Sequence, residues 1–162
     1  MSFLDRVKAA ATTAASQIKT RSTELSSRLA DEVTKYKNKD FLVAIVTGSA
    51  LVALADGTIS PEERSAMANY LRISEELKVF NGQEIVDEFN KAVALFEFDY
   101  KLGEVEALKR IAKIKSNEGA ARTLVRVCIS LANSDNNFDA KEKAAVTQIA
   151  KELGLDPSEF LG

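Results

Sequence analysis

The chain has 162 residues, 46% of them apolar, and a formal net charge of −2, which predict one domain, with or without an appendage. Its single cysteine and its lack of histidine exclude an internal disulfide, a zinc-type cysteine cluster and the commonest general base. Residues 1–39 hold eight Lys/Arg against four Asp/Glu whereas the remainder holds 14 against 20, and this acidic body argues against nucleic acid as its partner.

The first predicted element is a long amphipathic helix over residues 3–36, which contain neither Gly nor Pro. Apolar residues recur there at intervals of eleven, so an apolar stripe runs nearly straight along the helix. Two interpretations stay open. The segment is a tail that is solvated or orders on a partner, or it lies on a membrane surface with Phe3, Leu4 and Val7 inserted and Lys8 near lipid phosphates.

We expect residues 1–39 to form an N-terminal arm and residues 40–162 to form a helical domain. No segment is long and apolar enough to span a membrane, and the N-terminus lacks the apolar core of a signal peptide. The sequence therefore predicts a cytoplasmic protein, which is peripheral at the inner face of the membrane if its arm contacts lipid.

Two largely apolar segments organise the helical domain. Residues 41–55 are apolar on every side, which is typical of a buried central helix, and Asp40 is the expected N-terminal cap. Residues 117–134, which follow Ser116 as the expected cap, are their counterpart. Cys128 lies in an apolar run of this second segment, which indicates a core side chain rather than a reactive thiol.

Shorter helices are predicted around these two segments from capping residues and apolar spacing. They cover about 61–73, 75–80, 82–96, 104–115 and 140–153, with a last half-turn after residue 156. The expected fold class is all-α: a compact bundle of about seven core helices in two pseudo-repeats, plus the N-terminal amphipathic helix.

Two acidic turns, 79 positions apart, suggest the internal repeat. Each turn has an Asp where an apolar helix ends, then a Gly or Asn, then a Ser or Asp that begins the next helix, and a Glu three residues later. The residues are Asp56, Gly57, Ser60 and Glu63 in the first copy, and Asp135, Asn136, Asp139 and Glu142 in the second. This spacing predicts a capping box at the start of the helix after each turn.

Part of each turn is similar to the second half of a calcium-binding EF-hand loop, whose first and third positions must also supply oxygen ligands. Those positions hold Val52 and Leu54 in the first copy, and Leu131 and Asn133 in the second. An ordinary EF-hand is therefore excluded, because the first half of the loop is apolar helix.

What remains is a smaller set of oxygen donors: Asp56, Glu63, Asp135 and Glu142, with Ser60 and Asp139 less favoured. Such a set binds a hard divalent cation such as calcium if backbone carbonyls and water complete the shell. Alternatively, every donor has a folding role only, as a cap, a capping-box partner or a turn residue. Folding explains Asp56 and Asp135 least well, so these two are the strongest functional candidates.

Four motifs in the same order resemble the TerB-type tellurite-resistance proteins over about residues 36–160, and the first five residues also fit. They are Tyr36-Lys37-Asn38-Lys39-Asp40-Phe41, the Asp56 turn, Ser74-Glu75-Glu76-Leu77-Lys78-Val79-Phe80 and the Asp135 turn. The resemblance implies an all-helical fold with acidic residues at one end, proposed as a metal-binding surface. It also implies a cytoplasmic, non-enzymatic stress-system component that acts with a TerC-type integral membrane protein and calcium-binding TerD-type proteins.

These features favour a protein that binds rather than a catalyst. The first hypothesis is a metal-responsive scaffold that docks on a membrane partner and contributes to tellurite or general stress tolerance. The second is a metal-independent adaptor whose acidic end binds a basic loop of its partner. An enzyme is disfavoured, because tellurite reduction needs a thiol pair or a redox cofactor, and no nucleophile or oxyanion device accompanies the carboxylates.

Overall fold

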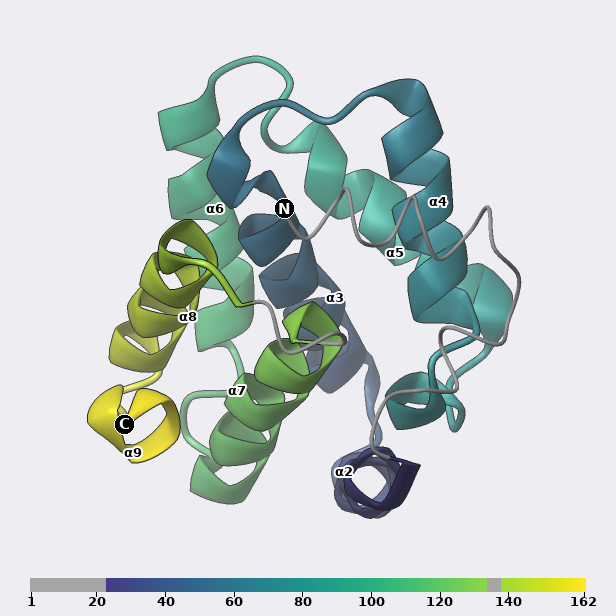
Figure 1. Cartoon of the computed structure of the whole chain (residues 1–162), viewed down its shortest axis with the longest axis vertical. Helices are drawn as coiled ribbons and strands as arrows, with labels where there is room; N and C mark the ends of the chain where they lie inside the picture. The colour runs from purple at the N-terminus through teal and green to yellow at the C-terminus, as the bar shows by residue number, and fades with distance from the viewer. Residues whose placement is uncertain (1–22, 134–137) are drawn as a thin grey trace.

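The computed structural model describes residues 23–133 and 138–162, and in these residues it contains eight α-helices, two short 3-10 helices and no strand (Figure 1). The predicted all-α class is confirmed, whereas the internal repeat stays a prediction. The elements are α2 (Thr23–Lys35), α3 (Lys39–Ala53), η2 (Leu54–Asp56), α4 (Pro61–Arg72), η3 (Glu75–Leu77), α5 (Gly82–Ala94), α6 (Tyr100–Ala112), α7 (Glu118–Ala132), α8 (Ala140–Glu152) and α9 (Ser158–Leu161).

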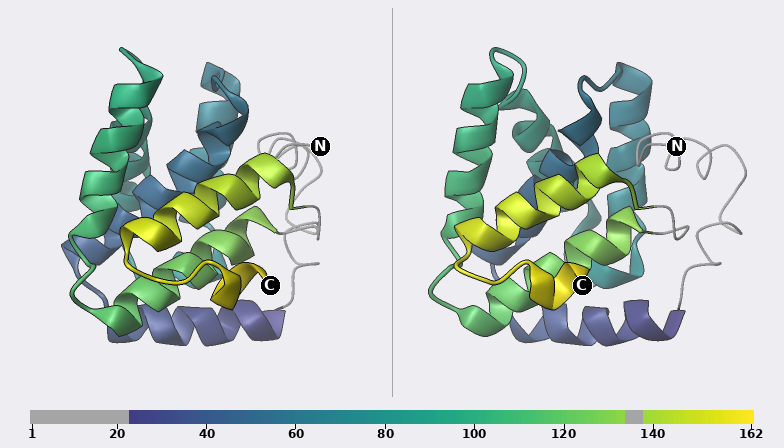
Figure 2. Two further views of the ribbon diagram at one scale, coloured as in Figure 1. Left: turned by 90° about the vertical axis from the view of Figure 1, so that its left-hand side faces the viewer. Right: turned by 60° about the vertical axis from the view of Figure 1, so that its left-hand side comes forward.

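Helix α3 is the centre of the bundle and contacts α5, α6, α7 and α8 (Figure 2). Twelve of its 15 residues are buried, as expected for a segment that is apolar on every side. Helix α7 packs against α3 and buries nine of its own 15 residues. The other helices therefore form a shell around one continuous apolar core, and the first acidic turn lies in that shell.

Side-chain caps begin most helices, and two of them differ from the predicted caps. Asn38 caps α3 by accepting the N–H of Phe41, so Asp40 lies inside the first turn, where the helix dipole favours a carboxylate. Asn117 caps α7 in place of Ser116. At both positions the observed cap is an asparagine. Its side-chain amide oxygen accepts a hydrogen bond from a backbone N–H, which is the same role that a serine hydroxyl or an aspartate carboxylate has at a cap.

Helix α6 begins at Tyr100, earlier than the predicted start near residue 104. Asp99 is its N-cap, because the Asp99 side chain accepts the N–H of Leu102. The first turn of α6 also packs closely on the end of α5. Tertiary contact, together with the local cap, thus extends the helix beyond its predicted range.

Helix α2 packs against η3 and α7 and buries Leu29, Ala30 and Val33. This part of the predicted N-terminal helix therefore contributes to the core. The remainder of that helix lies outside the described residues, and so do Phe3, Leu4, Val7 and Lys8. The predicted division at residue 39 stays a prediction.

Glu88 joins α5 to the start of α3. It is buried, and its Oε1 lies 3.1 Å from Nζ of Lys39 and 3.2 Å from Nζ of Lys91. Burial acts to raise the pKa of Glu88, but the hydrogen bonds from both lysines outweigh burial and lower this pKa from its usual 4.5. A carboxyl group whose pKa is lower in the folded than in the unfolded protein stabilises the fold at any pH above its pKa in the unfolded chain. This stabilisation is lost as the pH falls through its pKa in the folded protein.

Glu88→Gln should therefore weaken the dependence of stability on acid. We expect the free energy of unfolding to fall less in this variant than in the wild type between about pH 6 and about pH 3, measured by urea denaturation. Glu106→Gln is the control, because Glu106 forms an exposed pair with Lys109 on its own helix. The same acid dependence in Glu88→Gln and the wild type would contradict the stabilising role of Glu88.

Candidate functional site

The first acidic turn is the corner between α3 and α4. The 3-10 helix η2 extends α3 by one turn and ends at Asp56. Gly57 follows with a φ of 122°, a conformation that residues with a side chain rarely adopt. The chain then enters α4 through Ser60. Gly57 thus lets the chain turn sharply while Asp56 stays at the surface of the corner.

Both turns lead into a capping box, as predicted. Ser60 Oγ accepts the N–H of Glu63 at 3.1 Å, and Glu63 Oε1 accepts the N–H of Ser60 at 3.0 Å. The corresponding distances between Asp139 and Glu142 are 2.8 Å and 2.9 Å. Glu142 is fully buried, whereas Glu63 is half-buried. One oxygen of each glutamate is therefore engaged in starting a helix.

The first turn lies beside α8, the helix that follows the second turn in the sequence, because η2 packs against α8. Lys141, in the first turn of α8, places its Nζ 4.0 Å from Oδ1 of Asp56. The Asp56 side chain is 27% exposed and that of Lys141 is 68% exposed. Such a surface pair is worth little in stability, but it places an ammonium group where a cation would bind Asp56.

The metal candidates differ in how free their oxygens are. In the described ranges, which leave out Asp135, no three acidic or cysteine side chains gather closely enough to hold a metal ion. Of the remaining candidates, only Asp56 takes no part in a capping box. A cation at the first turn would have to compete with Lys141 and complete its shell with carbonyls, water or Asp135.

Two tyrosines hold the ends of the central helices beside the turns. The Tyr100 hydroxyl donates to the carbonyl of Leu54 at 3.1 Å, and the buried Tyr70 hydroxyl donates to the carbonyl of Leu131 at 2.9 Å. Burial, aided by the charge of Glu104, raises the pKa of Tyr100, so its hydroxyl remains a donor at neutral pH. Each tyrosine thus adds a donor to a carbonyl near a helix end.

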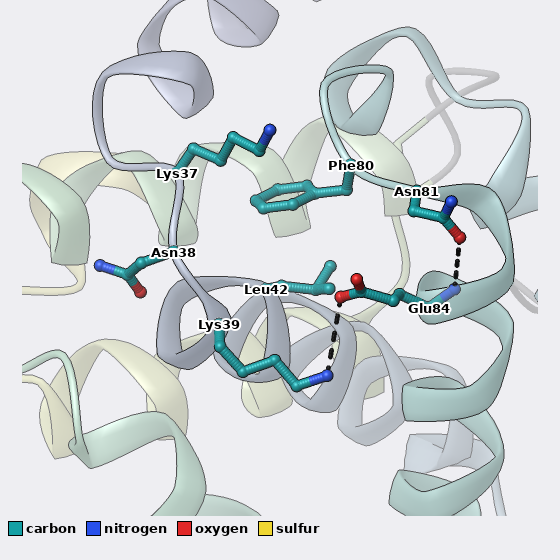
Figure 3. A pocket seen from close by; sticks show the side chains of 7 residues that line it. All are labelled: Lys37, Asn38, Lys39, Leu42, Phe80, Asn81 and Glu84. Carbon is teal, nitrogen blue, oxygen red and sulfur yellow. Dashed lines mark hydrogen bonds and ion pairs between the residues drawn. The ribbon is translucent and has the colours of Figure 1, made fainter.

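A polar pocket of about 410 Å³ lies between the segment before α3 and the start of α5 (Figure 3). Phe80 and Leu42 line it among polar side chains, and Lys39 places its Nζ 3.6 Å from Glu84 Oε2. Lys39 also contacts Glu88, so two carboxylates compensate its charge. The pocket is therefore better explained as part of the α3–α5 junction than as an anion site.

A more apolar groove of about 340 Å³ lies beside the first acidic turn. Residues 57–59 line one part of it, and the chain between α5 and α6 lines another. Its aromatic lining consists of Phe96, Phe98 and Tyr100, and the ring centroids of Phe96 and Tyr100 are 5.3 Å apart. An apolar groove and a carboxylate-bearing turn thus share one region of the surface.

Comparison with known proteins identifies the family. The family model for "Tellurite resistance protein TerB" matches residues 42–161. The chain belongs to the TerB family. The Tellurium resistance protein TerB of an Alcaligenes species is 39% identical over 129 residues, which cover 80% of this chain and 97% of that relative. No solved structure matches the chain significantly.

The TerB region begins inside α3 and ends in α9, so it contains both acidic turns, both capping boxes and the apolar groove. Helix α2 and the residues before it precede the matched region. In the part of the chain that the structure describes, no helix is long and apolar enough to cross a membrane.

The one cysteine of the TerB region is a core residue, as predicted. Cys128 is buried beside Gly48, and its burial raises the pKa of the thiol to about 12. A thiol with this pKa is protonated at neutral pH and is a poor nucleophile. Cys128 therefore packs the centre of the TerB bundle.

Several residues around the TerB turns were missed by sequence reasoning. The partners of Tyr70 and Tyr100 lie 61 and 46 positions away, and Lys141 contacts a residue of the other turn, so no local pattern points to these contacts. For Arg64 the sequence did contain an indication, because a basic residue follows the glutamate in both acidic turns. Its Nε donates to Asn90 Oδ1 at 2.9 Å, which fixes α4 on α5.

Proposed function

We propose that the chain is a metal-responsive, non-enzymatic scaffold module of a tellurite-resistance and stress-response system, and that it acts with a membrane partner. Membership of the TerB family and the printed name of the Alcaligenes relative support the tellurite-resistance role. The proposed response to a metal ion rests on one observation. Asp56 takes no part in the capping box of its turn, and its carboxylate lies beside the ammonium group of Lys141.

The proposed response is a competition at Asp56. A divalent cation, of which calcium is the leading candidate, takes the Asp56 carboxylate from Lys141 and uses Asp135 as its second acidic ligand. Because Lys141 belongs to α8, this exchange changes the charge of both turns together. The altered surface then binds the partner more or less tightly.

The proposed partners follow from the family resemblance. They are a TerC-type integral membrane protein and TerD-type proteins, met at the cytoplasmic face of the inner membrane. Residues 1–36, with Phe3, Leu4, Val7 and Lys8, contribute contact with that membrane or with a partner. The burial of Cys128 supports a non-enzymatic role, because the thiol is inaccessible to an oxyanion substrate.

Isothermal titration of the full chain with calcium, magnesium and manganese tests the metal proposal. We expect Asp56→Asn combined with Asp135→Asn to weaken binding at least about tenfold, or about 1.4 kcal/mol. Lys141→Met should tighten binding, because it removes the competing ammonium group. Asp87→Asn, which alters an exposed carboxylate on α5, is the matched control. Unchanged affinity in the double variant would contradict this site while leaving the scaffold role intact.

A metal-independent adaptor is the second candidate, in which the acidic end binds a basic loop of the partner. The engagement of Glu63 and Glu142 in capping boxes favours it, because this leaves few oxygens for a metal. Pull-down of the partner by the full chain separates the two functions. Binding that persists in chelator and weakens with added salt indicates the adaptor, whereas binding lost in chelator indicates the metal-responsive module.

A further inference from the structure

The first two turns of α6 expose an apolar stripe that no other described element covers. Phe98, just before the helix, is 92% exposed, and Leu102 and Val105 are 56% and 51% exposed. The spacing of three residues places Leu102 and Val105 on one face of the helix, and Phe98 immediately precedes the N-cap Asp99. Exposed aromatic and aliphatic side chains that cluster in this way usually mark an interaction site.

The stripe continues into the apolar groove beside the first acidic turn. Phe98 belongs to both, and Ile59 and Phe96 line the groove further on. We call the stripe and the groove together the α6 surface. It therefore combines a concave part of about 340 Å³ with an exposed helical face, which suits an amphipathic segment.

The charges around the α6 surface are mainly negative. Residues 97–109 contain four carboxylates and two lysines, and each lysine is paired with a glutamate of α6 itself. Among the described residues, Glu97 and Asp99 line the groove and no basic side chain does. Nη1 of Arg64 lies 2.9 Å from Oε1 of Glu97 and compensates its charge, which leaves Asp99 as the uncompensated carboxylate of the groove in this part of the chain. A second copy of the same face would bring like charges together, and anionic lipid would be repelled. The fitting occupant is apolar and basic.

The chain itself contains such a segment in residues 1–22. It carries four bases against one acid, a net charge of +3, whereas the remainder of the chain carries −5. Its apolar residues recur at helical spacing: Phe3, Val7, Ala11, Ala14 and Ile18. We propose that residues 1–22 dock on the α6 surface of their own chain, with the apolar residues against the stripe and the bases near Asp99.

The length of the segment permits this contact from its attachment at α2. With residues 3–18 helical and residues 19–22 extended, the segment reaches about 37 Å, whereas a domain of about 140 residues has a radius of gyration of about 14 Å. Covalent attachment also provides an effective concentration in the millimolar range. Even if its intrinsic affinity is weak, the segment is therefore bound to the α6 surface of its own chain most of the time.

Docking has a consequence for the membrane contact proposed above. Phe3 and Val7 cannot occupy the α6 surface and a lipid surface at the same time, so docking holds the arm away from the membrane. The inference does not rest on metal binding at Asp56, and its test contains no metal.

Paramagnetic relaxation in the full chain tests the docking. A spin label at Ser2→Cys reacts selectively because Cys128 is buried and protonated. We expect the amide signals of residues 98–105 to lose more than half of their intensity when the label is paramagnetic. Phe98→Ser combined with Leu102→Ser should restore these signals, whereas Ile73→Ser, at an apolar residue that is 43% exposed at the end of α4, should not.

A mixed sample shows whether the arm docks on its own chain or on a second copy of the chain. Chains that carry the label but no ¹⁵N are combined with ¹⁵N chains that carry no label, and we expect no loss of intensity at residues 98–105. Loss in the mixed sample would assign the contact to a second copy and overturn docking within one chain. Unperturbed signals in the singly labelled chain, or equal loss in the Phe98→Ser, Leu102→Ser variant, would also overturn the proposal.

Discussion

Gly103→Ala is expected to lower the free energy of unfolding by about 2–3 kcal/mol, which makes it one of the two most damaging single changes that we predict. A Cβ atom at Gly103 would lie 2.7 Å from the carbonyl oxygen of Leu95 and 2.7 Å from Cα of Phe96. Both atoms are backbone, so α6 itself would have to move away from the end of α5.

Helix propensity alone predicts the opposite sign for this substitution. Alanine inside an exposed helix is favoured over glycine by about 1 kcal/mol, so a stabilised Gly103→Ala would show that the close approach is unimportant. Gly82→Ala is the control, because its Cβ would meet only the flexible side chain of Arg72, at 3.0 Å. Urea denaturation followed by circular dichroism measures both, and we expect Gly82→Ala to stay within about 0.5 kcal/mol of the wild type.

Glu142→Ala is the second large effect, at about 2–3 kcal/mol of lost stability. The fully buried Glu142 carboxylate accepts the N–H of Asp139, so truncation leaves this donor unsatisfied and a cavity beside it. The same change in the first turn, Glu63→Ala, should cost only about 1 kcal/mol, because water reaches the half-buried site.

The two glutamates thus form a matched pair within one molecule. Glu142→Gln keeps a side-chain oxygen that can accept the same N–H, and we expect it to recover most of the loss. Chemical denaturation of the three variants at neutral pH provides the comparison. Equal losses in Glu142→Ala and Glu63→Ala would show that the capping box, rather than burial, determines the cost.

The parts of the fold that depend on neighbouring residues were predictable from the sequence. Ser60, Pro61 and Glu63 determine a helix start within four positions, and the structure has the predicted cap and box there. The apolar run of α3 likewise predicted a buried central helix. The start of α6 was missed although its cap is a local signal of the same kind, since the Asp99 side chain accepts the N–H of Leu102 three residues later.

The candidate site was predictable only in part, because contacts between segments that are distant in the sequence form much of it. Sequence spacing identified both acidic turns, but it carried no sign that Lys141 would lie beside Asp56. The apolar stripe of α6 was also missed, since spacing alone does not distinguish a side chain that packs on the core from one that remains exposed. Contacts between distant segments decide both features.

The central position of α3 has a consequence for synthesis of the chain on the ribosome. Helix α8 is one of the helices that bury its twelve buried residues. However, α8 ends at Glu152, 99 positions after the end of α3 at Ala53. At a translation rate of about 5–20 residues per second, the nascent chain presents an incompletely covered apolar helix for roughly 5–20 s, although α5, α6 and α7 are made before α8. We therefore expect the emerging polypeptide to be a chaperone client until its C-terminal helices leave the exit tunnel.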